Sequence, residues 1–151
     1  MRAIAIVLSL VALGCAPIGT TPGMRLGGSA AAAPNSFVFV QETEVIQLEV
    51  RGMLFPRVMN VWTVGFDDAM YVWSLLGSRW SQRIDERPDE VRVRVGKQVY
   101  EVRATLVEDA KEKERVAQAY QPKYADSLFE YFGRATTVDD YDLFYRLTPR
   151  N

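Results

Sequence analysis

The sequence predicts an α+β fold built around a mostly antiparallel, barrel-like sheet. Two segments, 58–74 and 91–107, show the alternation and central turn that are typical of β-hairpins. Both faces of the first hairpin are largely apolar, which indicates strands of a closed or two-layered sheet. Helical segments fall between and after the two hairpins, and this order is typical of an α+β architecture.

The first fifteen residues are not expected to be part of this fold. Met1-Arg2 is followed by an uncharged run over 3–13, and Gly14-Cys15 comes directly after it. Such a run suits a signal peptide and is too short to span a bilayer. It resembles a bacterial lipoprotein signal, which implies a leader over 1–15, a lipidated Cys15, and an exported protein anchored in the cell envelope, in the outer membrane or facing the periplasm. The alternative is an ordinary secretory signal with an incidental cysteine.

Residues 16–36 predict a flexible tether. Ala, Gly, Pro, Thr and Ser make up most of this segment, which has one charged residue and no aromatic residue. Such a composition buries too little apolar surface to offset the entropy lost on ordering. We therefore expect the folded domain to comprise residues 37–151.

The first strands are predicted between residues 46 and 74. Residues 46–50 alternate apolar and polar side chains, which indicates a half-buried strand. Segments 58–66 and 69–74 flank an Asp-Asp dipeptide that suits a two-residue turn. This register places Phe66 opposite Ala69, Val64 opposite Tyr71 and Trp62 opposite Trp73, so one face of the hairpin is expected to be strongly aromatic.

The hairpin over 91–107 is the best specified element. Gly96-Lys97 separates its two alternating runs, and glycine at the first turn position suits a type II′ turn. A shift of one residue would destroy the cross-strand pattern, so the register is well determined. The diagnostic pairs are Arg92 with Glu101, which are complementary in charge, and Val93 with Tyr100, which are apolar.

Helices are predicted on either side of this hairpin. Residues 78–87 contain no helix breaker and stop before Pro88, which indicates a short linking helix. Residues 109–120 form a charged amphipathic pattern that we expect to resume after Pro122 over 124–132. A closing strand is predicted within 139–148.

Composition excludes several classes of function. The chain carries 18 Lys+Arg against 19 Asp+Glu, so there is no electrostatic reason to expect nucleic acid as a partner. With no histidine and one cysteine, it has no intrachain disulfide, no Cys/His zinc site and no Ser-His-Asp triad. Seven Phe, seven Tyr and three Trp supply enough aromatic surface for a core or for a ring-shaped ligand.

The order of features from Pro56-Arg57 to the 91–107 hairpin resembles the flavin-binding split β-barrel superfamily. These features are a Pro-Arg step, a strand, an acidic turn, a strand ending in Ser74, a Gly-Ser pair, a short helix and a proline before the hairpin. Within the superfamily the chain most resembles deazaflavin-dependent nitroreductases, relatives of pyridoxamine-phosphate oxidases. The resemblance implies a split β-barrel with a short linking helix and a C-terminal helical pair before the last strand.

The resemblance also implies a cofactor and a set of site residues. It indicates FMN or a deazaflavin coenzyme, reduction of small aromatic or quinone-like substrates, and a homodimer with the cofactor groove at the subunit interface. The implied cofactor-binding residues are Arg57, Trp62, Tyr71, Ser74, Gly77, Ser78, Arg79, Trp80 and Arg83. Gly77-Ser78 at a helix start, with nearby arginines, would suit a phosphate. Tyr120 and Tyr124 match tyrosines that line the substrate side and are the catalytic candidates.

Each of these patterns also has a purely structural interpretation. Arg79 and Arg83 would equally form a solvated helix face, the tryptophans would equally be core, and the two tyrosines would equally attach a helix to the barrel. Three aspartates over 139–142 have carboxylate density suited to a metal, or simply mark the turn before a strand.

One difference from the superfamily favours a second function. Relatives usually have a Gly-Arg-Lys-Ser-Gly type loop before the Pro-Arg step, where this chain has residues 51–55 with the sequence Arg-Gly-Met-Leu-Phe. The alternative is therefore a non-catalytic envelope lipoprotein of the same fold, without a cofactor, that binds a ligand or a protein partner.

Overall fold

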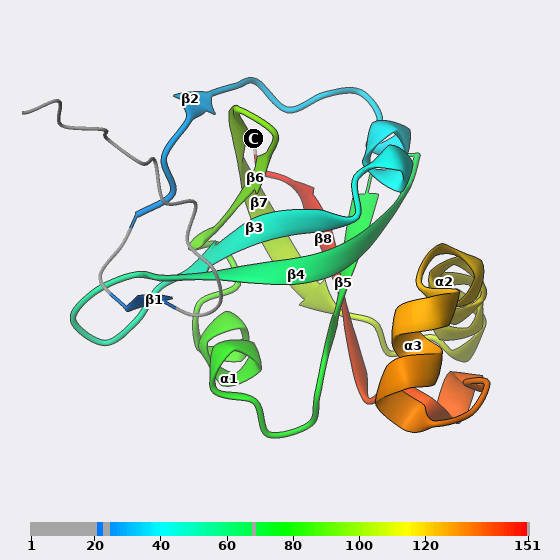
Figure 1. The fold of residues 1–151 in the computed structure, drawn as a ribbon. Helices are drawn as coiled ribbons and strands as arrows, with labels where there is room; N and C mark the ends of the chain where they lie inside the picture. The colour runs from blue at the N-terminus through cyan, green and yellow to red at the C-terminus, as the bar shows by residue number, and fades with distance from the viewer. Residues whose placement is uncertain (1–20, 23–24, 68, 151) are drawn as a thin grey trace, which may run out of the picture.

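Six strands close into a barrel in the computed structural model, which describes residues 21–22, 25–67 and 69–150. The strands are β3 (Val45–Val50), β4 (Arg57–Phe66), β5 (Ala69–Ser74), β6 (Val91–Val95), β7 (Gln98–Leu106) and β8 (Leu143–Pro149). Their order around the barrel is β4-β3-β6-β7-β8-β5, every neighbouring pair is antiparallel, and β5 pairs back onto β4 (Figure 1). The predicted α+β split barrel is confirmed. The leader and Cys15 lie outside the described residues.

The β6–β7 hairpin has the predicted register. Arg92 lies opposite Glu101 and Val93 lies opposite Tyr100. Gly96 has a φ of +59°, and Lys97 is not among the residues with positive φ, which is the combination that a type II′ turn requires.

The β4–β5 hairpin follows the predicted register only in part. Phe66 lies opposite Ala69, as predicted, but the ladder ends at Thr63 and Val72, one pair before the predicted Trp62–Trp73 pair. Beyond that point β4 remains paired with β3, while β5 pairs with β8. The two strands therefore part at the tryptophans, and the divergence is visible in Figure 1.

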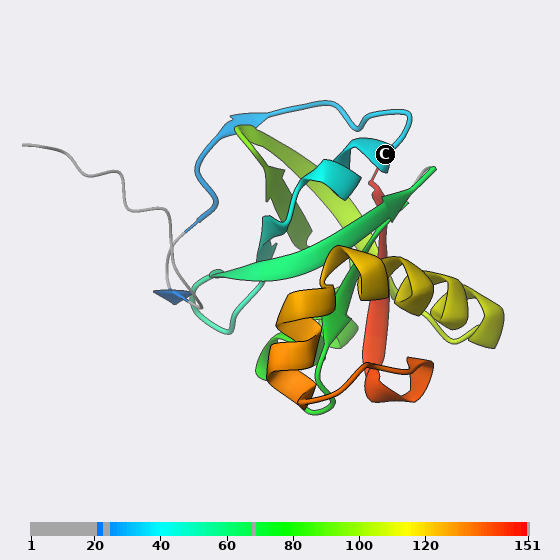
Figure 2. The ribbon, with the colours of Figure 1, turned by 45° about the vertical axis from the view of Figure 1, so that its right-hand side comes forward.

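Three helices occupy the predicted places in the chain. Helix α1 (Arg79–Glu86) begins after the N-cap residue Ser78, and α2 (Ala110–Lys123) begins after the N-cap residue Asp109. Helix α3 (Ala125–Phe132) follows directly, and α2 and α3 together cover one side of the barrel (Figure 2). Among the described residues, no helix has the length and apolar character needed to cross a membrane.

Helix α2 extends further than the sequence predicts, because Pro122 lies inside it. Proline removes one N–H donor, yet the next turn is kept by the bond from the Tyr124 N–H to the Tyr120 carbonyl, at 2.9 Å. The break between the two helices therefore falls at Tyr124.

The apolar residues form two main clusters, one inside the barrel and one between the sheet and the helical pair. The barrel interior includes Leu48, Val93 and Leu147. The second cluster includes Tyr120 and Phe144 and is continued by partly buried Trp62 and Trp73. The second cluster thus reaches the place where β4 and β5 part.

The segment predicted as a tether over 16–36 is held on the barrel in its described part. Leu26 is buried with Val58 and Val99, and its N–H donates to Glu49 Oε2 at 2.6 Å. The short strands β1 (Thr21–Pro22) and β2 (Ser29–Ala30) pair with β4 and β7, and the 3₁₀ helix η1 (Val38–Glu42) follows. Ordered structure therefore begins before residue 37. Backbone pairing and the burial of one leucine offset the entropy lost on ordering this segment, and neither contribution can be read from its composition.

Candidate functional site

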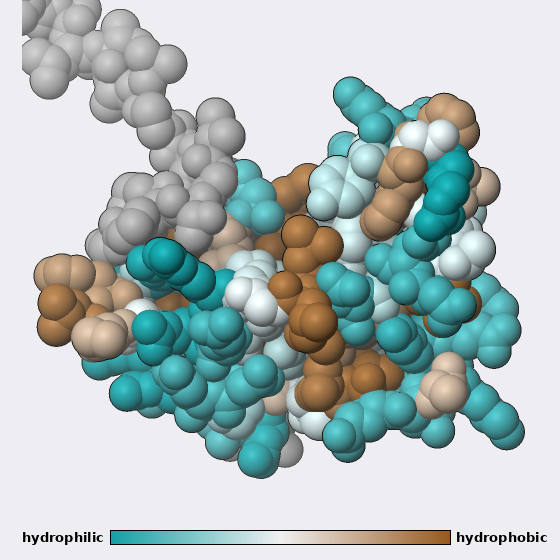
Figure 3. Space-filling view, turned by 90° about the horizontal axis from the view of Figure 1, so that it is seen from below, coloured by the Kyte–Doolittle hydropathy of each residue, from teal (hydrophilic) through white to brown (hydrophobic). Residues whose placement is uncertain are grey.

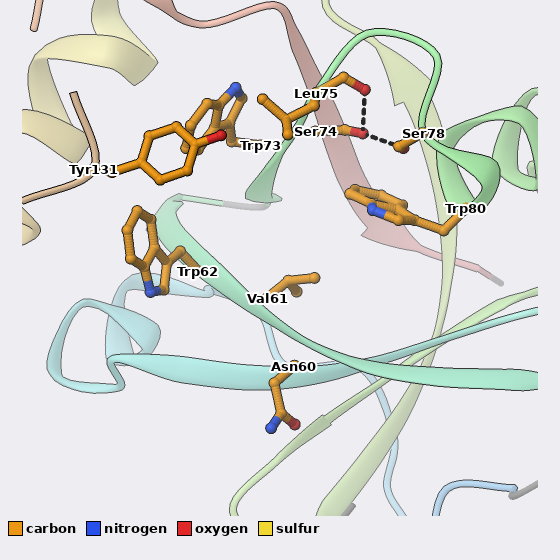
Figure 4. A pocket seen from close by; sticks show the side chains of 9 residues that line it. All are labelled: Asn60, Val61, Trp62, Trp73, Ser74, Leu75, Ser78, Trp80 and Tyr131. Atoms are coloured by element: carbon orange, nitrogen blue, oxygen red, sulfur yellow. Dashed lines mark hydrogen bonds between the residues drawn. The ribbon is translucent and has the colours of Figure 1, made fainter. Parts of the chain in front are cut away.

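A pocket of about 300 Å³ opens where β4 and β5 part. Strand β4, the end of β5 with the loop after it, the start of α1, and α3 all contribute to its walls (Figure 4). The lining residues are Asn60, Val61, Trp62, Trp73, Ser74, Leu75, Ser78, Trp80 and Tyr131.

The walls of this pocket are aromatic on two sides. Trp62 and Trp73 stack with ring centroids 6.3 Å apart, and Tyr131 meets Trp73 edge to face at 6.4 Å. Trp80 lies across the opening from these three rings (Figure 4). A flat aromatic molecule entering the pocket would therefore meet ring surfaces from both directions, an arrangement that suits stacking.

The tryptophans are held from behind by the core. Trp62 stacks on Tyr124 with centroids 4.8 Å apart, and Trp73 packs edge to face on Tyr141 at 5.4 Å. Trp80 packs against Tyr145 in a tilted arrangement, with ring centroids 6.1 Å apart. These contacts limit the rotamers of the rings, so the pocket walls are largely formed before any ligand arrives.

The polar side chains that line the pocket include Asn60 and two serines, and the serine hydroxyls are already bonded within the protein. Ser74 Oγ and Ser78 Oγ lie 2.7 Å apart, and Ser78 Oγ donates to Ser81 Oγ at 2.9 Å. Ser78 Oγ also accepts the Ser81 N–H at 3.3 Å as the cap of α1. The described residues that line the pocket include no charged side chain.

Four of the nine predicted cofactor residues are brought together here: Trp62, Ser74, Ser78 and Trp80. Gly77 adjoins the site in the loop before α1, with a φ of +75° that permits the sharp entry into the helix. Trp73 completes the aromatic wall, as the predicted aromatic face of the hairpin suggests.

The other predicted cofactor residues do not line the pocket. Arg83 bonds Glu86 at 2.7 Å on the outer side of α1, and Arg79 is exposed on the same helix, as the solvated-face interpretation expects. Arg57 lies at the far end of β4 beside Gly52. Tyr71 lies under α2, where its hydroxyl donates to Glu112 Oε1 at 2.7 Å.

The two catalytic candidates are buried, and their hydroxyls do not line the pocket. Tyr120 donates to the Trp62 carbonyl at 2.8 Å, and Tyr124 donates to the Glu44 carbonyl at 2.6 Å while accepting the Thr63 N–H at 2.8 Å. Burial raises the pKa of Tyr120 well above its usual value and that of Tyr124 to about 12. Both tyrosines therefore fasten the helical pair to β4, which is the structural interpretation of the pattern.

Lys123 reinforces the same attachment and was not indicated by the sequence. Its ammonium donates to the carbonyls of Val40, Thr43 and Thr63 at 2.7–2.9 Å. Burial lowers its pKa to about 8. Tyr131 was also missed, because no sequence pattern indicates which residue of α3 reaches the pocket.

Two of the three aspartates over 139–142 have structural contacts close to the start of β8. Asp140 accepts from the Thr137 N–H at 2.7 Å and pairs with Arg134. Asp142 accepts the Leu76 N–H at 2.8 Å. In the described part of the chain, no group of three or more Cys or acidic residues is placed to hold a metal ion.

Comparison with known families and proteins connects the chain to one family. A family model described as an uncharacterized protein conserved in bacteria, DUF2255, matches residues 39–141. No curated protein matches the sequence.

Several solved structures share the fold at low sequence identity. A candidate pyridoxamine 5′-phosphate oxidase from Listeria innocua is 15% identical, with a TM-score of 0.57 over 74% of this chain and 88% of the other. A FAD-binding protein from Mesorhizobium loti is 13% identical, with a TM-score of 0.55 over 74% and 85%. A candidate 5-nitroimidazole antibiotic resistance protein from Bacteroides thetaiotaomicron is 12% identical, with a TM-score of 0.55 over 74% and 76%. The chain thus has the split-barrel fold of the pyridoxamine-phosphate-oxidase type.

Proposed function

The chain belongs to the DUF2255 family, and we propose that its tryptophan-lined pocket binds a planar aromatic ring of the flavin type. The observation that supports this proposal is the two-sided aromatic wall made by Trp62, Trp73 and Tyr131 opposite Trp80. Aromatic rings held in fixed positions around a gap favour a flat ligand, since stacking adds to the free energy gained from burial.

The dimensions of the pocket favour a single ring system. Small-ligand pockets typically occupy roughly 300–1,000 Å³, and this one, at about 300 Å³, lies at the lower end. FMN or a deazaflavin coenzyme fits this size better than a dinucleotide if the ring occupies the pocket and the phosphate lies outside it. Since the pocket lining carries no charged side chain, a phosphate would have to reach the exposed Arg79.

A bound flavin or deazaflavin would supply hydride or electron transfer to a small aromatic or quinone-like substrate. The residues of this chain would orient the ring through the tryptophans and exclude water from one of its faces. No described residue that lines the pocket carries a carboxylate, an ammonium or a guanidinium, so proton transfer from the chain itself would fall to Ser74, Ser78 or Tyr131.

This lack of charged side chains in the described pocket lining favours a second candidate function. The second candidate is a non-catalytic envelope protein of the same fold that binds an aromatic ligand or a protein partner. The buried and fully bonded hydroxyls of Tyr120 and Tyr124 agree with it. Reduction of a quinone-like substrate by the protein reconstituted with a flavin or deazaflavin would support the enzymatic function over the binding function.

Titration of tryptophan fluorescence with riboflavin, FMN and a deazaflavin tests the proposal. We expect quenching that saturates for at least one of them and that Trp62→Leu weakens. Equal affinity for riboflavin and FMN would show that the phosphate contributes nothing. Tighter binding of FMN, abolished by Arg79→Ala with Arg83→Ala, would assign the phosphate to α1. No saturable binding of any of the three would refute the proposal.

The envelope location and the dimer are part of the same proposal. Lipidation at Cys15 is supported by the signal-like residues that precede it, and a homodimer is supported by resemblance to split barrels. Fractionation of a Cys15→Ser variant tests the first, with loss of membrane association expected, and light scattering tests the second.

A further inference from the structure

We propose that the loop between β3 and β4 is a membrane-contact element that inserts its apolar tip into an anionic lipid surface. This inference concerns a different part of the molecule from the pocket and does not depend on the pocket's ligand.

The tip of this loop consists of three consecutive large apolar residues that the fold leaves in solvent. Met53 and Leu54 are each 80% exposed and Phe55 is 64% exposed. The apolar group at the left edge of Figure 3 belongs to this loop, which projects from the barrel at the same edge in Figure 1. Exposing three such side chains in a row is unfavourable in water, so their arrangement indicates a surface that covers them.

The backbone holds this tip in its projecting shape. The Phe55 carbonyl closes over Gly52 so tightly that a Cβ at position 52 would lie 2.0 Å from its oxygen. Only glycine permits this approach, and the closed turn directs residues 53–55 away from the barrel. The apolar tip is therefore built into the loop and is not a frayed end.

Arginines surround the base of the loop. Arg51 and Arg57 flank the tip in sequence, and a hollow beside it is lined by Arg25, Arg51, Arg92 and Arg150, with Pro56 and two glutamates. Three of these arginines are paired with glutamates: Arg92 with Glu49 at 2.8 and 2.9 Å, Arg51 with Glu90 at 3.7 Å, and Arg150 with Glu101. Among the described residues Arg25 and Arg57 form no such pair, so they supply the excess positive charge at the base of the loop. An apolar tip with cations at its base matches the order of acyl chains and phosphates in an anionic bilayer, which is why the occupant is assigned as lipid.

The path of the chain brings its N-terminal part to the same edge. Thr21 and Pro22 pair with Val58 and Arg57, the residues that follow the loop. Five residues lie between Cys15 and Thr21, and an extended chain of this length spans at most about 20 Å, which limits the distance of Cys15 from this edge. A lipid chain on Cys15 would hold the loop close to the bilayer, and two weak membrane contacts together anchor more firmly than either alone.

A probe on the loop tests this directly in the full chain, because brominated acyl chains quench only a label that itself enters the hydrocarbon region. An environment-sensitive fluorophore is attached at Leu54→Cys in the Cys15→Ser background. The matched control carries the label at Phe129→Cys, which is 60% exposed on α3, across the barrel from the loop. Vesicles contain phosphatidylcholine alone or with one quarter phosphatidylglycerol.

We expect a blue shift and quenching by brominated acyl chains for the Leu54 label with anionic vesicles, and no change for the Phe129 label. In unlabelled protein, Leu54→Asp with Phe55→Asp should weaken anionic vesicle binding about tenfold or more, as loss of two apolar contacts predicts. Circular dichroism confirms that this variant is folded. An unchanged Leu54 label, equal responses of the two labels, or a response that appears on raising protein concentration without lipid would overturn the proposal.

Discussion

Two aromatic regions of this protein lie side by side and differ in what they leave accessible. Under α2 and α3, Tyr120, Tyr124 and Phe144 are buried, and the two tyrosine hydroxyls are bonded to the backbone of β4 at Trp62 and Thr63. At the pocket, Trp62 and Tyr131 keep part of their ring surface open. The difference shows two roles for aromatic residues of neighbouring regions. Rings that are buried and have bonded hydroxyls stabilise the fold, whereas rings that keep an exposed surface offer a place for a ligand to bind.

Truncation in the buried region should have the largest effect. Tyr120→Ala removes a fully buried ring and leaves a cavity beneath α2, so we expect a loss of about 3–5 kcal/mol in the free energy of unfolding. Urea denaturation measures it. The matched variant Tyr131→Ala, at a 62% exposed ring, should cost less than about 1 kcal/mol. Similar losses at the two positions would remove the distinction between the regions.

A smaller change isolates the hydroxyl of Tyr124. Tyr124→Phe keeps the ring that supports Trp62 but leaves the buried Thr63 N–H without its acceptor, so we expect a loss of about 1–3 kcal/mol. Chemical denaturation checks the value. Tyr131→Phe serves as the control and should leave the free energy of unfolding unchanged within error.

Ligand affinity should show the opposite order of effects, with the larger loss at the exposed Tyr131 and almost none at the buried Tyr124. Tyr131→Ala should weaken binding of the best flavin-type ligand by about three- to tenfold, which corresponds to the contribution of one aromatic contact. Fluorescence titration measures the affinity. Tyr124→Phe should leave that affinity nearly unchanged, because the Tyr124 hydroxyl is not part of the pocket. An equal loss in both variants would mean that the pocket depends on the helical attachment as a whole.

The smallest expected effect concerns the dependence of stability on pH. Burial raises the pKa of Tyr124 to about 12, whereas a tyrosine in the unfolded chain titrates near 10. Above pH 10 the unfolded state therefore loses this proton first, so the stabilisation present below pH 10 decreases as the pH rises toward 12. We expect Tyr124→Phe to flatten this alkaline decline in urea melts. An identical slope for wild type and variant would contradict the burial of the hydroxyl.

Local chemistry was sufficient to predict most of the fold. The β6–β7 register followed from alternating charges and a glycine turn, and the helices were found near their predicted bounds. Composition predicted a free tether up to residue 36, whereas Leu26 and the backbone of residues 29–31 are bound to the barrel. Such long-range backbone pairing leaves no periodic signal in the segment itself.

The candidate site was less predictable than the fold. Trp62, Ser74, Ser78 and Trp80 were proposed from the sequence and meet at one pocket. Tyr71 was placed on the same aromatic face but lies under α2, and Arg57 lies at the far end of its strand. The sequence specifies which face of a strand a side chain occupies, but it does not specify where along that face a helix covers it.

By itself, therefore, the sequence determined the class of fold and the order of its elements. It also determined that no histidine takes part in any chemistry and that many aromatic side chains are present. Only the tertiary structure decided that β4 and β5 part at the tryptophans, that α3 brings Tyr131 to the gap, and that Tyr120 and Tyr124 are closed off. The physical reason is the distance in sequence over which each interaction acts. Turn chemistry and alternation act between residues near one another in the chain. The pocket exists because the end of β5 pairs with β8, a strand far away in the sequence, and so leaves β4.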